Sequence, residues 1–540
     1  MSQPDAAPDS PPETAPAPAR DDAATAGRGF LVITAAKLWF MVGGVAINFG
    51  LPYIFGSDLF YGEGADGRAL YGQYIDLNNT LSILSMVMVT GVMQSVARFV
   101  SERPGDPGGV VRQARNMMLV VGTLVAGGFI LLAPWIASAR SNPELVNGYR
   151  AAGLILFAYG VYTVFIGTLN GRKQFFRQAL FDIGFTTLKS FLVLGLAIAG
   201  LGVIGAFSGF ATAALIIMAV AIWRVGRDLP DGPRAKGLYT FAAWVMGYTL
   251  VFNFIFKLDV LMLKPLAVDM YQSAEWLIGG GALFEWIRGR AVEVSADGLV
   301  GTYGLALNIS RVPWQATIAI TFVVFPMVSE ATFAQDRERT RLYIRQTLRY
   351  SMILVGAAAV VLVAVPEAVF GLLPRSFADG VVALAWLAPA YFCFSLFNIV
   401  NTLIMSAGRA DQAMIIGLLT IGLAAGLYYT ILPGAMGLHD LLQRTGICTL
   451  IAFAFGLVLG LGLLWVRYGP PAPLATTLRV LAIGGALVGA GLFIPPMGRI
   501  ASLAVAAAVG IGFLVLLVIS GEFGAEDKER LMRIIKRKKG

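Results

Sequence analysis

The segment TGICTLIAFAFGLVLGLGLLWV, residues 445–466, contains no charged residue over 22 consecutive positions. A helix of this length is long enough to cross a hydrocarbon core of about 30 Å. Similar apolar blocks recur along the whole chain of 540 residues, which is 57% hydrophobic and only 14% charged. A soluble domain carries about 25% charged residues, so this chain has too little polar surface to coat a globule. The composition therefore predicts an all-α polytopic membrane protein.

About fourteen apolar blocks are predicted to cross the membrane as helices. They cover residues 30–55, 75–99, 116–138, 151–170, 179–200, 203–223, 241–266, 299–328, 350–373, 381–406, 412–432, 445–466, 477–495 and 499–520. With a cytoplasmic N-terminus, about 28 of the 41 Lys and Arg fall in cytoplasmic segments, as the positive-inside rule requires. Both termini are therefore predicted to be cytoplasmic. The same distribution explains the net charge of +9 without a nucleic-acid partner.

The residue types needed for metal or enzyme chemistry are sparse. Cys393 and Cys448 both lie in apolar blocks and His439 is the only histidine, so neither a disulfide framework nor a metal site is predicted. No loop carries the paired carboxylates or Asp-rich pattern of a metal-dependent membrane enzyme. We therefore expect a transporter without a cofactor rather than an enzyme.

Two parts of the chain repeat the same short motifs. The second span opens on LYGQY (70–74) and closes on VSE (100–102), and the eighth opens on LVGTY (299–303) and closes on VSE (328–330). An offset of six spans keeps both copies in the same orientation. This arrangement predicts two parallel six-helix repeats, an architecture in which transporters rock one half against the other around a central site.

The predicted organisation follows from the spans and the repeat. It comprises a disordered cytoplasmic N-terminus (1–28), a first lobe with spans 1–6 (29–240), a second lobe with spans 7–12 (241–466), two extra C-terminal helices (467–520) and a basic cytoplasmic tail (521–540). The longest segment between spans, 267–298, is expected to be an outer loop.

The motifs resemble those of the multidrug/oligosaccharidyl-lipid/polysaccharide (MOP) exporter superfamily, within it the polysaccharide-biosynthesis and lipid II flippase branches. The resemblance rests on YGQY (71–74), GVMQSVARFVSE (91–102), GTY (301–303) through PMVSE (326–330), and Ala407-Gly408-Arg409. It implies a MATE-like fold in a bacterial plasma membrane. It also implies alternating access and an undecaprenyl-diphosphate-linked saccharide as cargo, with membrane lipids and polysaccharide polymerase or synthase components as partners.

Charged residues inside the spans are candidates for the substrate site, since they are costly to bury unless they have a function or a partner. Phosphate oxygens are naturally held by basic side chains, and the family has essential bases in its first two and eighth helices. The predicted substrate-binding residues are Lys37, Arg98, Lys189, Lys257 and Arg311. Asp259 is the candidate for coupling to protons or sodium, whereas drive by the membrane potential would need no such carboxylate.

Each base also has a structural reading. Lys257 could pair with a neighbouring helix, Lys189 with Asp182, and Arg98 could be an orientation anchor. Other functions also remain open: a lipid II flippase, a cation-coupled drug extruder, and a non-transporting subunit of a polysaccharide synthase complex. A drug extruder would favour an acidic cavity, whereas the charges within the spans here are mainly basic.

Overall fold

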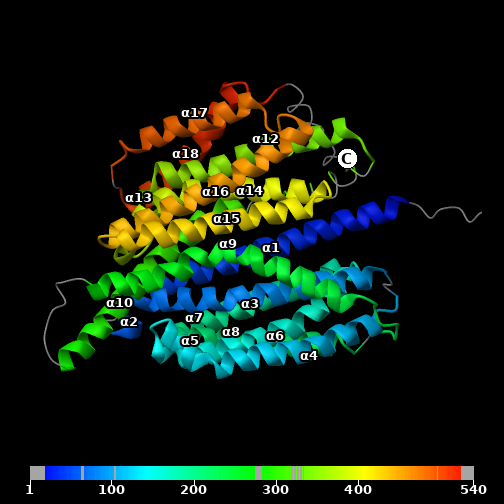
Figure 1. Ribbon diagram of the computed structural model, residues 1–540, viewed down its shortest axis with the longest axis horizontal. Helices are drawn as coiled ribbons and strands as arrows, with labels where there is room; N and C mark the ends of the chain where they lie inside the picture. Colours follow the sequence, from blue (N-terminus) through cyan, green and yellow to red (C-terminus); the bar gives the residue numbers. More distant parts are fainter. Residues whose placement is uncertain are drawn as a thin grey trace, which may run out of the picture.

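The computed structural model describes residues 19–524 except 63–65, 103–104, 228, 274–281, 316, 318–319, 321–323, 325–327, 329–330, 333 and 496. All regular secondary structure in this part of the chain is helical. Figure 1 shows helices α3 to α8 on one side and α12 to α18 on the other, with α1 and α9 running between them. The predicted all-α class is confirmed.

The first bundle contains the helices that precede residue 226. Its members are α1 (Ala19–Phe55), α2 (Asp58–Tyr61), α3 (Gly67–Glu102), α4 (Gly108–Leu131), α5 (Ala133–Ala139), α6 (Val146–Gly171), α7 (Phe175–Leu196) and α8 (Gly202–Val225). A π-helical segment, Ala197–Leu201, joins α7 to α8.

The second bundle and the C-terminal pair contain the remaining helices. They are α9 (Leu238–Ser273), α10 (Ala282–Ser310), α12 (Arg337–Ala364), α13 (Pro366–Phe370), α14 (Gly380–Ser406), α15 (Ala410–Ile431), α16 (Leu438–Tyr468), α17 (Leu474–Gly491) and α18 (Arg499–Ile519). Helices α17 and α18 pack on α12 and on each other, so they are attached to one side of the second bundle.

The predicted repeat is visible in the packing partners of the helices. In the first bundle α3 and α4 pack on α6, α6 on α8, α1 on α7, and α7 on α8. In the second bundle α10 and α12 pack on α14, α14 on α16, α9 on α15, and α15 on α16. The same pattern of neighbours therefore occurs twice, which agrees with two parallel repeats.

Eleven segments of the described chain are long and apolar enough to cross a membrane, judged by length and composition. This number is lower than the fourteen predicted spans, and one segment, Phe175–Val225, contains both α7 and α8. The multi-pass character of the chain is clear from these segments, whereas the count of fourteen stays a prediction.

The structure differs from the prediction in two segments. Helix α1 begins at Ala19, inside the segment 1–28 that was expected to be disordered. The outer segment 267–298 is largely helical, because α9 continues to Ser273 and α10 begins at Ala282. The charged residues of this segment lower its hydropathy but do not terminate a helix. The helices therefore extend beyond the apolar run from which the span was predicted.

Several helix ends follow signals in the sequence. The Asp66 carboxylate accepts hydrogen bonds from the backbone N–H of Arg68 (2.9 Å) and Ala69 (3.3 Å) at the start of α3, as N-capping residues do. Asp336 caps α12 in the same way through the N–H of Arg339 (2.9 Å). Gly408, at φ 80°, ends α14, because this left-handed conformation is cheap only for glycine.

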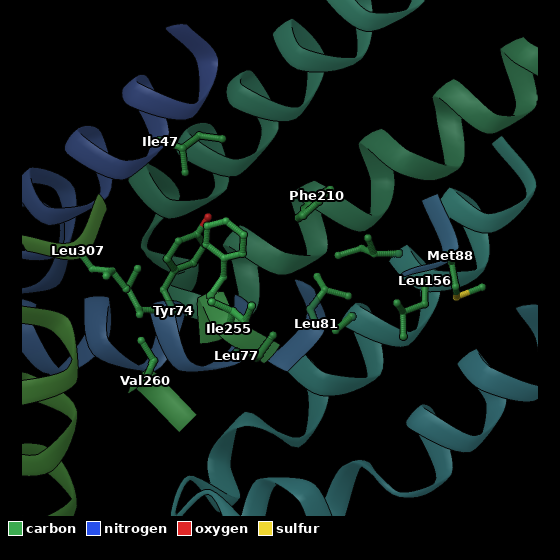
Figure 2. Close-up of a cluster of buried hydrophobic side chains, with 14 of the residues drawn as sticks. Ile47, Tyr74, Leu77, Leu81, Met88, Leu156, Phe210, Ile255, Val260 and Leu307 are labelled. Carbon is green, nitrogen blue, oxygen red and sulfur yellow. The ribbon is translucent and has the colours of Figure 1, made fainter. Parts of the chain in front are cut away.

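The apolar core is continuous between the bundles along α3. Figure 2 shows Tyr74, Leu77 and Leu81 of α3 among side chains of neighbouring helices from both bundles, including Phe210 of α8 and Val260 of α9. These side chains are buried. Helix α3 therefore belongs to the packing of both halves and forms the centre of their interface.

Candidate functional site at the interface of the two bundles

The two bundles meet where α3 packs on α9 and α10. We call the end of this interface near Gly67, where α3 begins, the outer end, and the end near Glu102 the inner end, following the predicted orientation. Two groups of polar side chains lie along the interface. The outer cluster consists of Asp76, Arg140, Asn142, Lys264 and Asp297. The central cluster consists of Lys257, Asp259, Tyr303, Arg311 and Tyr391.

At the outer end two glycines bring the backbones of α3 and α10 into contact. A Cβ on Gly72 would overlap the carbonyl oxygen of Asp297, and one on Gly301 would lie 2.8 Å from the backbone nitrogen of Gly72. Small residues permit this close approach of membrane helices. The two glycines are also the matched positions of the repeated motif. The motif is therefore explained by the place where its two copies meet.

Four charged side chains are buried beside this glycine contact. Asp76, Lys264 and Asp297 are each 1% exposed and Arg140 is 12% exposed. The Nε of Arg140 lies 3.1 Å from both carboxylate oxygens of Asp76, and the Nζ of Lys264 lies 2.7 Å from Oδ1 of Asp297. Burying one unpaired charge costs several kcal/mol. Here two positive and two negative charges compensate one another.

The contacts in the outer cluster divide by bundle. The pair Arg140–Asp76 lies within the first bundle and the pair Lys264–Asp297 within the second. The contacts between bundles are longer or involve a neutral partner: Lys264 Nζ to Asp76 Oδ2 at 3.8 Å, Asn142 Nδ2 to Asp297 Oδ1 at 3.3 Å, and Arg140 Nη1 to the carbonyl of Leu261 at 3.0 Å. Separation of the bundles here would leave one neutral ion pair on each.

In the central cluster Arg311 is held by neutral groups. It follows the last residue of α10, Ser310, in a turn two residues before Pro313. Its Nε donates to the hydroxyl of Tyr391 on α14 (2.9 Å) and its Nη2 to the carbonyl of Phe256 on α9 (2.7 Å). No carboxylate among the described residues forms an ion pair with it. The guanidinium is therefore held within the second bundle by two neutral oxygen atoms rather than by a directly paired carboxylate.

The other charged members of the central cluster are Lys257 and Asp259 of α9. The Nζ of Lys257 donates to Oδ1 of Asn79 on α3 (2.6 Å), so this bond joins the two bundles. Asp259 is 4% exposed and accepts hydrogen bonds from the Tyr303 hydroxyl (2.9 Å) and from the N–H of Val260 (2.8 Å). The formal charge of the central cluster is +1, since two bases accompany one carboxylate.

The five predicted bases do not form a single site. Arg311 and Lys257 lie together, whereas Lys189 of α7 lies inside the first bundle, with its Nζ 5.0 Å from the ring centre of Phe210. Arg98 is exposed near the inner end of α3 and stacks over Phe241 at 4.2 Å. Lys37 is on α1, but its side chain lies outside the described residues.

The sequence-based prediction missed the charged residues of the outer cluster as site residues. Lys264 lies within the predicted span 241–266 and is a base at membrane depth like the others. Asp76 lies in the predicted span 75–99, and Arg140 and Asp297 lie just outside the ends of spans. The available signal was opposite charges at similar depth on different helices. That signal does not identify the partners, because pairing depends on which helices are neighbours.

Comparison with known proteins agrees with this architecture. Residues 71–266 match the family model of a polysaccharide biosynthesis protein, and no curated protein matches the sequence significantly. The lipid II flippase MurJ, in an inward closed conformation, has a similar fold with a TM-score of 0.69 and 11% sequence identity, over 91% of this chain and 98% of that chain.

Two further solved structures share the fold. An inward-facing multidrug resistance MATE family transporter of the MOP superfamily has a TM-score of 0.57 and 14% identity, over 78% of this chain and 93% of that chain. A MOP superfamily transporter from Pyrococcus furiosus has a TM-score of 0.53 and 15% identity, over 84% and 96% of the two chains. The chain thus has a transporter fold, and the family match together with this fold is consistent with the MOP exporter superfamily.

Proposed function

We propose that the protein is a flippase that translocates an undecaprenyl-diphosphate-linked saccharide from the cytoplasmic to the outer leaflet by alternating access. The match to a polysaccharide biosynthesis family and the MurJ-like fold support this choice. In this proposal the moving bundles are residues 29–240 and 241–466, and residues 467–520 form an additional pair. The membrane is a bacterial plasma membrane with both termini on the cytoplasmic side.

The observation that carries the proposal is that Arg311 is held by neutral acceptors rather than by a directly paired carboxylate. Its guanidinium is held by a hydroxyl and a backbone carbonyl, so it can exchange these neutral acceptors for phosphate oxygens when cargo arrives. Arginine suits a diphosphate because its planar fork donates two parallel hydrogen bonds. Lys257, which now bonds to Asn79, supplies the second positive charge.

The two clusters have different roles in the proposed cycle. The outer cluster and the Gly72–Gly301 contact close the outer end while cargo binds from the inner side. Opening then separates the bundles at the outer end, with one neutral ion pair remaining on each. The hydrogen bond from Tyr303 fixes the orientation of the Asp259 carboxylate. In the proposed cycle Asp259 couples the motion to an ion, either by gaining and losing a proton or by binding and releasing a cation.

Transport of a fluorescent undecaprenyl-diphosphate oligosaccharide in proteoliposomes tests the proposal. Wild type is compared with Arg311→Ala, with Arg311→Lys, and with Arg150→Ala as a control. Arg150 is exposed and hydrogen-bonds only to Asn147 on its own helix in the described part of the chain. We expect flipping to fall at least about tenfold in Arg311→Ala, corresponding to a loss of roughly 1.4 kcal/mol or more. The lysine variant should be intermediate and the control normal.

Normal flipping by a well-folded Arg311→Ala protein would refute the site. No flipping of any diphosphate-linked saccharide by the wild type, with transport of amphipathic cations instead, would favour a drug extruder. Since the MurJ fold makes lipid II the second candidate cargo, the assay includes lipid II beside a repeat-unit saccharide. The cargo that is flipped faster identifies whether the protein belongs with the lipid II flippases or with the polysaccharide-biosynthesis flippases.

A further inference from the structure

A short segment at the outer end reaches from the second bundle to the first. Residues 371–379 join α13 to α14, and we call them the outer strap. The N–H of Phe377 donates to the carbonyl of Pro374 (3.0 Å) and the N–H of Ala378 to that of Arg375 (3.1 Å). These hydrogen bonds close a 3-10 turn, which fixes the direction in which the Phe377 side chain leaves the backbone.

Phe377 anchors the outer strap on the first bundle. Its side chain is fully buried, although it lies in a connection between two helices. Its ring meets the ring of Tyr71 on α3 edge-on, with the ring centres 5.8 Å apart and an interplanar angle of 85°. Tyr71 in turn donates a hydrogen bond to the carbonyl of Asn48 on α1 (3.2 Å). Because a buried aromatic pair of this geometry is stabilising, Phe377 holds the second bundle against the first.

Two polar contacts of the outer strap also reach the first bundle. Near the start of the strap, the hydroxyl of Tyr53 on α1 donates to the carbonyl of Leu372. At the end of the strap, Oδ2 of Asp379 lies 3.9 Å from Nη1 of Arg68, at the start of α3. The bundles therefore cannot separate at the outer end without breaking these two contacts and the aromatic contact of Phe377.

Asp379 has a second partner, which lies in its own bundle. Its Oδ1 is 3.2 Å from Nε2 of His439, in the first turn of α16. His439 is exposed and is the only histidine of the chain. Histidine is the side chain whose charge changes between pH 5 and 8. The Asp379 carboxylate thus lies between a permanent cation on the first bundle and a titratable group on the second.

The other ionisable groups around the outer strap belong to types that do not ordinarily titrate between pH 5 and 8. In the described part of the chain they are Arg375 within the strap, Asp66 beside Arg68 (3.6 Å), the pair Asp440–Arg444 of α16 (2.7 Å), Tyr271 of α9, and Arg499 of α18, whose guanidinium is 5.9 Å from the ring centre of Tyr53. A change of charge beside the strap in this range therefore points to His439.

We propose that the outer strap is a latch that holds the outer end closed, and that His439 makes this latch sensitive to external pH. At neutral pH Asp379 attracts Arg68 across the interface. Protonated His439 binds Asp379 within the second bundle and repels Arg68, so acid loosens the latch while Phe377 still holds it. The inference rests on the proposed alternating access but not on the identity of the cargo.

Distances between spin labels at the outer end test this proposal without any cargo. One label is placed at Arg150 of α6 and the other at Tyr429 of α15, which are both exposed, and Cys393 and Cys448 are replaced. Double electron–electron resonance in lipid nanodiscs gives the ratio of outer-open to closed protein. It is measured at about pH 8 and about pH 5, the limits of the range in which histidine titrates.

Five variants separate the parts of the latch. His439→Gln removes the titratable group, and His439→Lys keeps a positive charge at both pH values. Phe377→Ala removes the buried ring, and Tyr53→Phe removes one exposed contact, so that the strap is still tested if the alanine variant does not fold. Arg112→Gln is the matched control, because Arg112 forms an exposed ion pair with Asp231 at the inner end.

We expect acid to raise the ratio of outer-open to closed protein about two- to threefold in wild type and in the control, as the loss of one weak, exposed ion pair would. His439→Gln should keep the neutral-pH ratio at both pH values, and His439→Lys the acid ratio. Phe377→Ala should raise the ratio about threefold or more at both pH values and still respond to acid. Tyr53→Phe should raise it about twofold.

Two results would overturn the proposal. A response to acid that persists in His439→Gln, or that is absent in wild type, would remove the role of His439. An unchanged ratio in folded Phe377→Ala, or in Tyr53→Phe if the alanine variant does not fold, would show that the strap does not hold the outer end closed. These results are independent of transport, since a protein with a working latch that flips no diphosphate-linked saccharide would refute only the proposed function.

Discussion

The outer and central clusters lie on the same interface but differ in how their charges are satisfied. In the outer cluster every charged side chain has an oppositely charged partner and the four are nearly excluded from solvent. In the central cluster Arg311 and Lys257 bond to neutral oxygen atoms. At the outer end the backbones of α3 and α10 are also in direct contact, through Gly72 and Gly301.

This difference separates closure from binding. Charges that are already paired have little to gain from a ligand, whereas a cation held by neutral acceptors gains a charge-assisted bond when a phosphate arrives. The outer cluster is therefore suited to holding the bundles together, and the central cluster to receiving an anionic group. Changes in the two clusters should consequently have different effects on stability and transport.

The largest effect on stability is expected from Lys264→Met. It leaves Asp297 without its cation in a buried position, and breaking a buried ion pair in this way costs about 3–5 kcal/mol. The double variant Lys264→Met/Asp297→Asn removes both charges and should recover most of the loss. Thermal unfolding in detergent measures both variants. If the single variant were as stable as wild type, the outer cluster would not be a tightly paired group.

A second effect is expected from Gly72→Ala, which changes no charge. The added methyl group overlaps the Asp297 carbonyl, and forcing atoms into a packed interface costs about 1–3 kcal/mol. Because this cost applies only while the outer end is closed, the variant should favour the outer-open state. Labelling of a cysteine at Asn142 by an impermeant maleimide added from outside should become several-fold faster. Gly127→Ala is the control, because a Cβ there meets no atom within 4 Å.

A third effect, confined to stability, is expected from a charged group outside the interface. Glu522 follows α18 and accepts hydrogen bonds from Thr476 (2.5 Å), Arg479 (2.8 Å) and Arg349 (2.7 Å). Burial raises the pKa of Glu522, but these hydrogen bonds outweigh it and the pKa lies below the ordinary value of 4.5. Glu522→Gln should cost about 1–3 kcal/mol and leave flipping unchanged.

The low pKa of Glu522 also gives the sign of the pH dependence. A carboxyl whose pKa is lowered by folding stabilises the protein fully above its unfolded pKa, and this stabilisation is lost as the pH falls through the folded value. The stability difference between wild type and Glu522→Gln should therefore shrink below about pH 4.5. If the stability difference between wild type and Glu522→Gln stayed constant down to the lowest accessible pH, the ionised Glu522 carboxylate would not be the source of the stabilisation.

The architecture could be predicted from the sequence because apolar length and the repeated glycine motif are local signals. Gly72 and Gly301 were recognised as matched positions, and the structure adds the reason, which is that they touch. Other features depend on more than hydropathy. The end of α10 at Ser310, inside the predicted span 299–328, follows from the turn at Arg311, and the helical continuation of α9 and α10 beyond the apolar belt has no hydropathy signal.

The site was predictable only in part. Arg311, Lys257 and Asp259, which lie together in the structure, stand out in the sequence because charges within apolar runs are conspicuous; their role in transport stays a prediction. The sequence could not show that Lys189 and Arg98 lie apart from these three residues. Their positions depend on the direction in which each helix presents its side chains. The pairing of Asp76 with Arg140 joins residues 64 positions apart. They come together because α3 packs on α6, which also contacts α5, the helix that Arg140 follows.

The central claim, that the bundles separate at the outer end during transport, can be tested with a disulfide. A Cβ at Gly298 of α10 would lie 3.7 Å from the Cβ of Arg68 on α3, which is the usual spacing of bridged cysteines. The variant Arg68→Cys/Gly298→Cys is made with Cys393 and Cys448 replaced, and the two single variants serve as controls.

The measurement is flipping of the fluorescent lipid-linked oligosaccharide by the double cysteine protein, oxidised and then reduced. The account predicts that oxidation lowers flipping to the rate of protein-free vesicles, that reduction restores it, and that the single variants respond to neither treatment. Undiminished flipping by fully cross-linked protein would contradict the account, because cargo would then cross without the outer end opening.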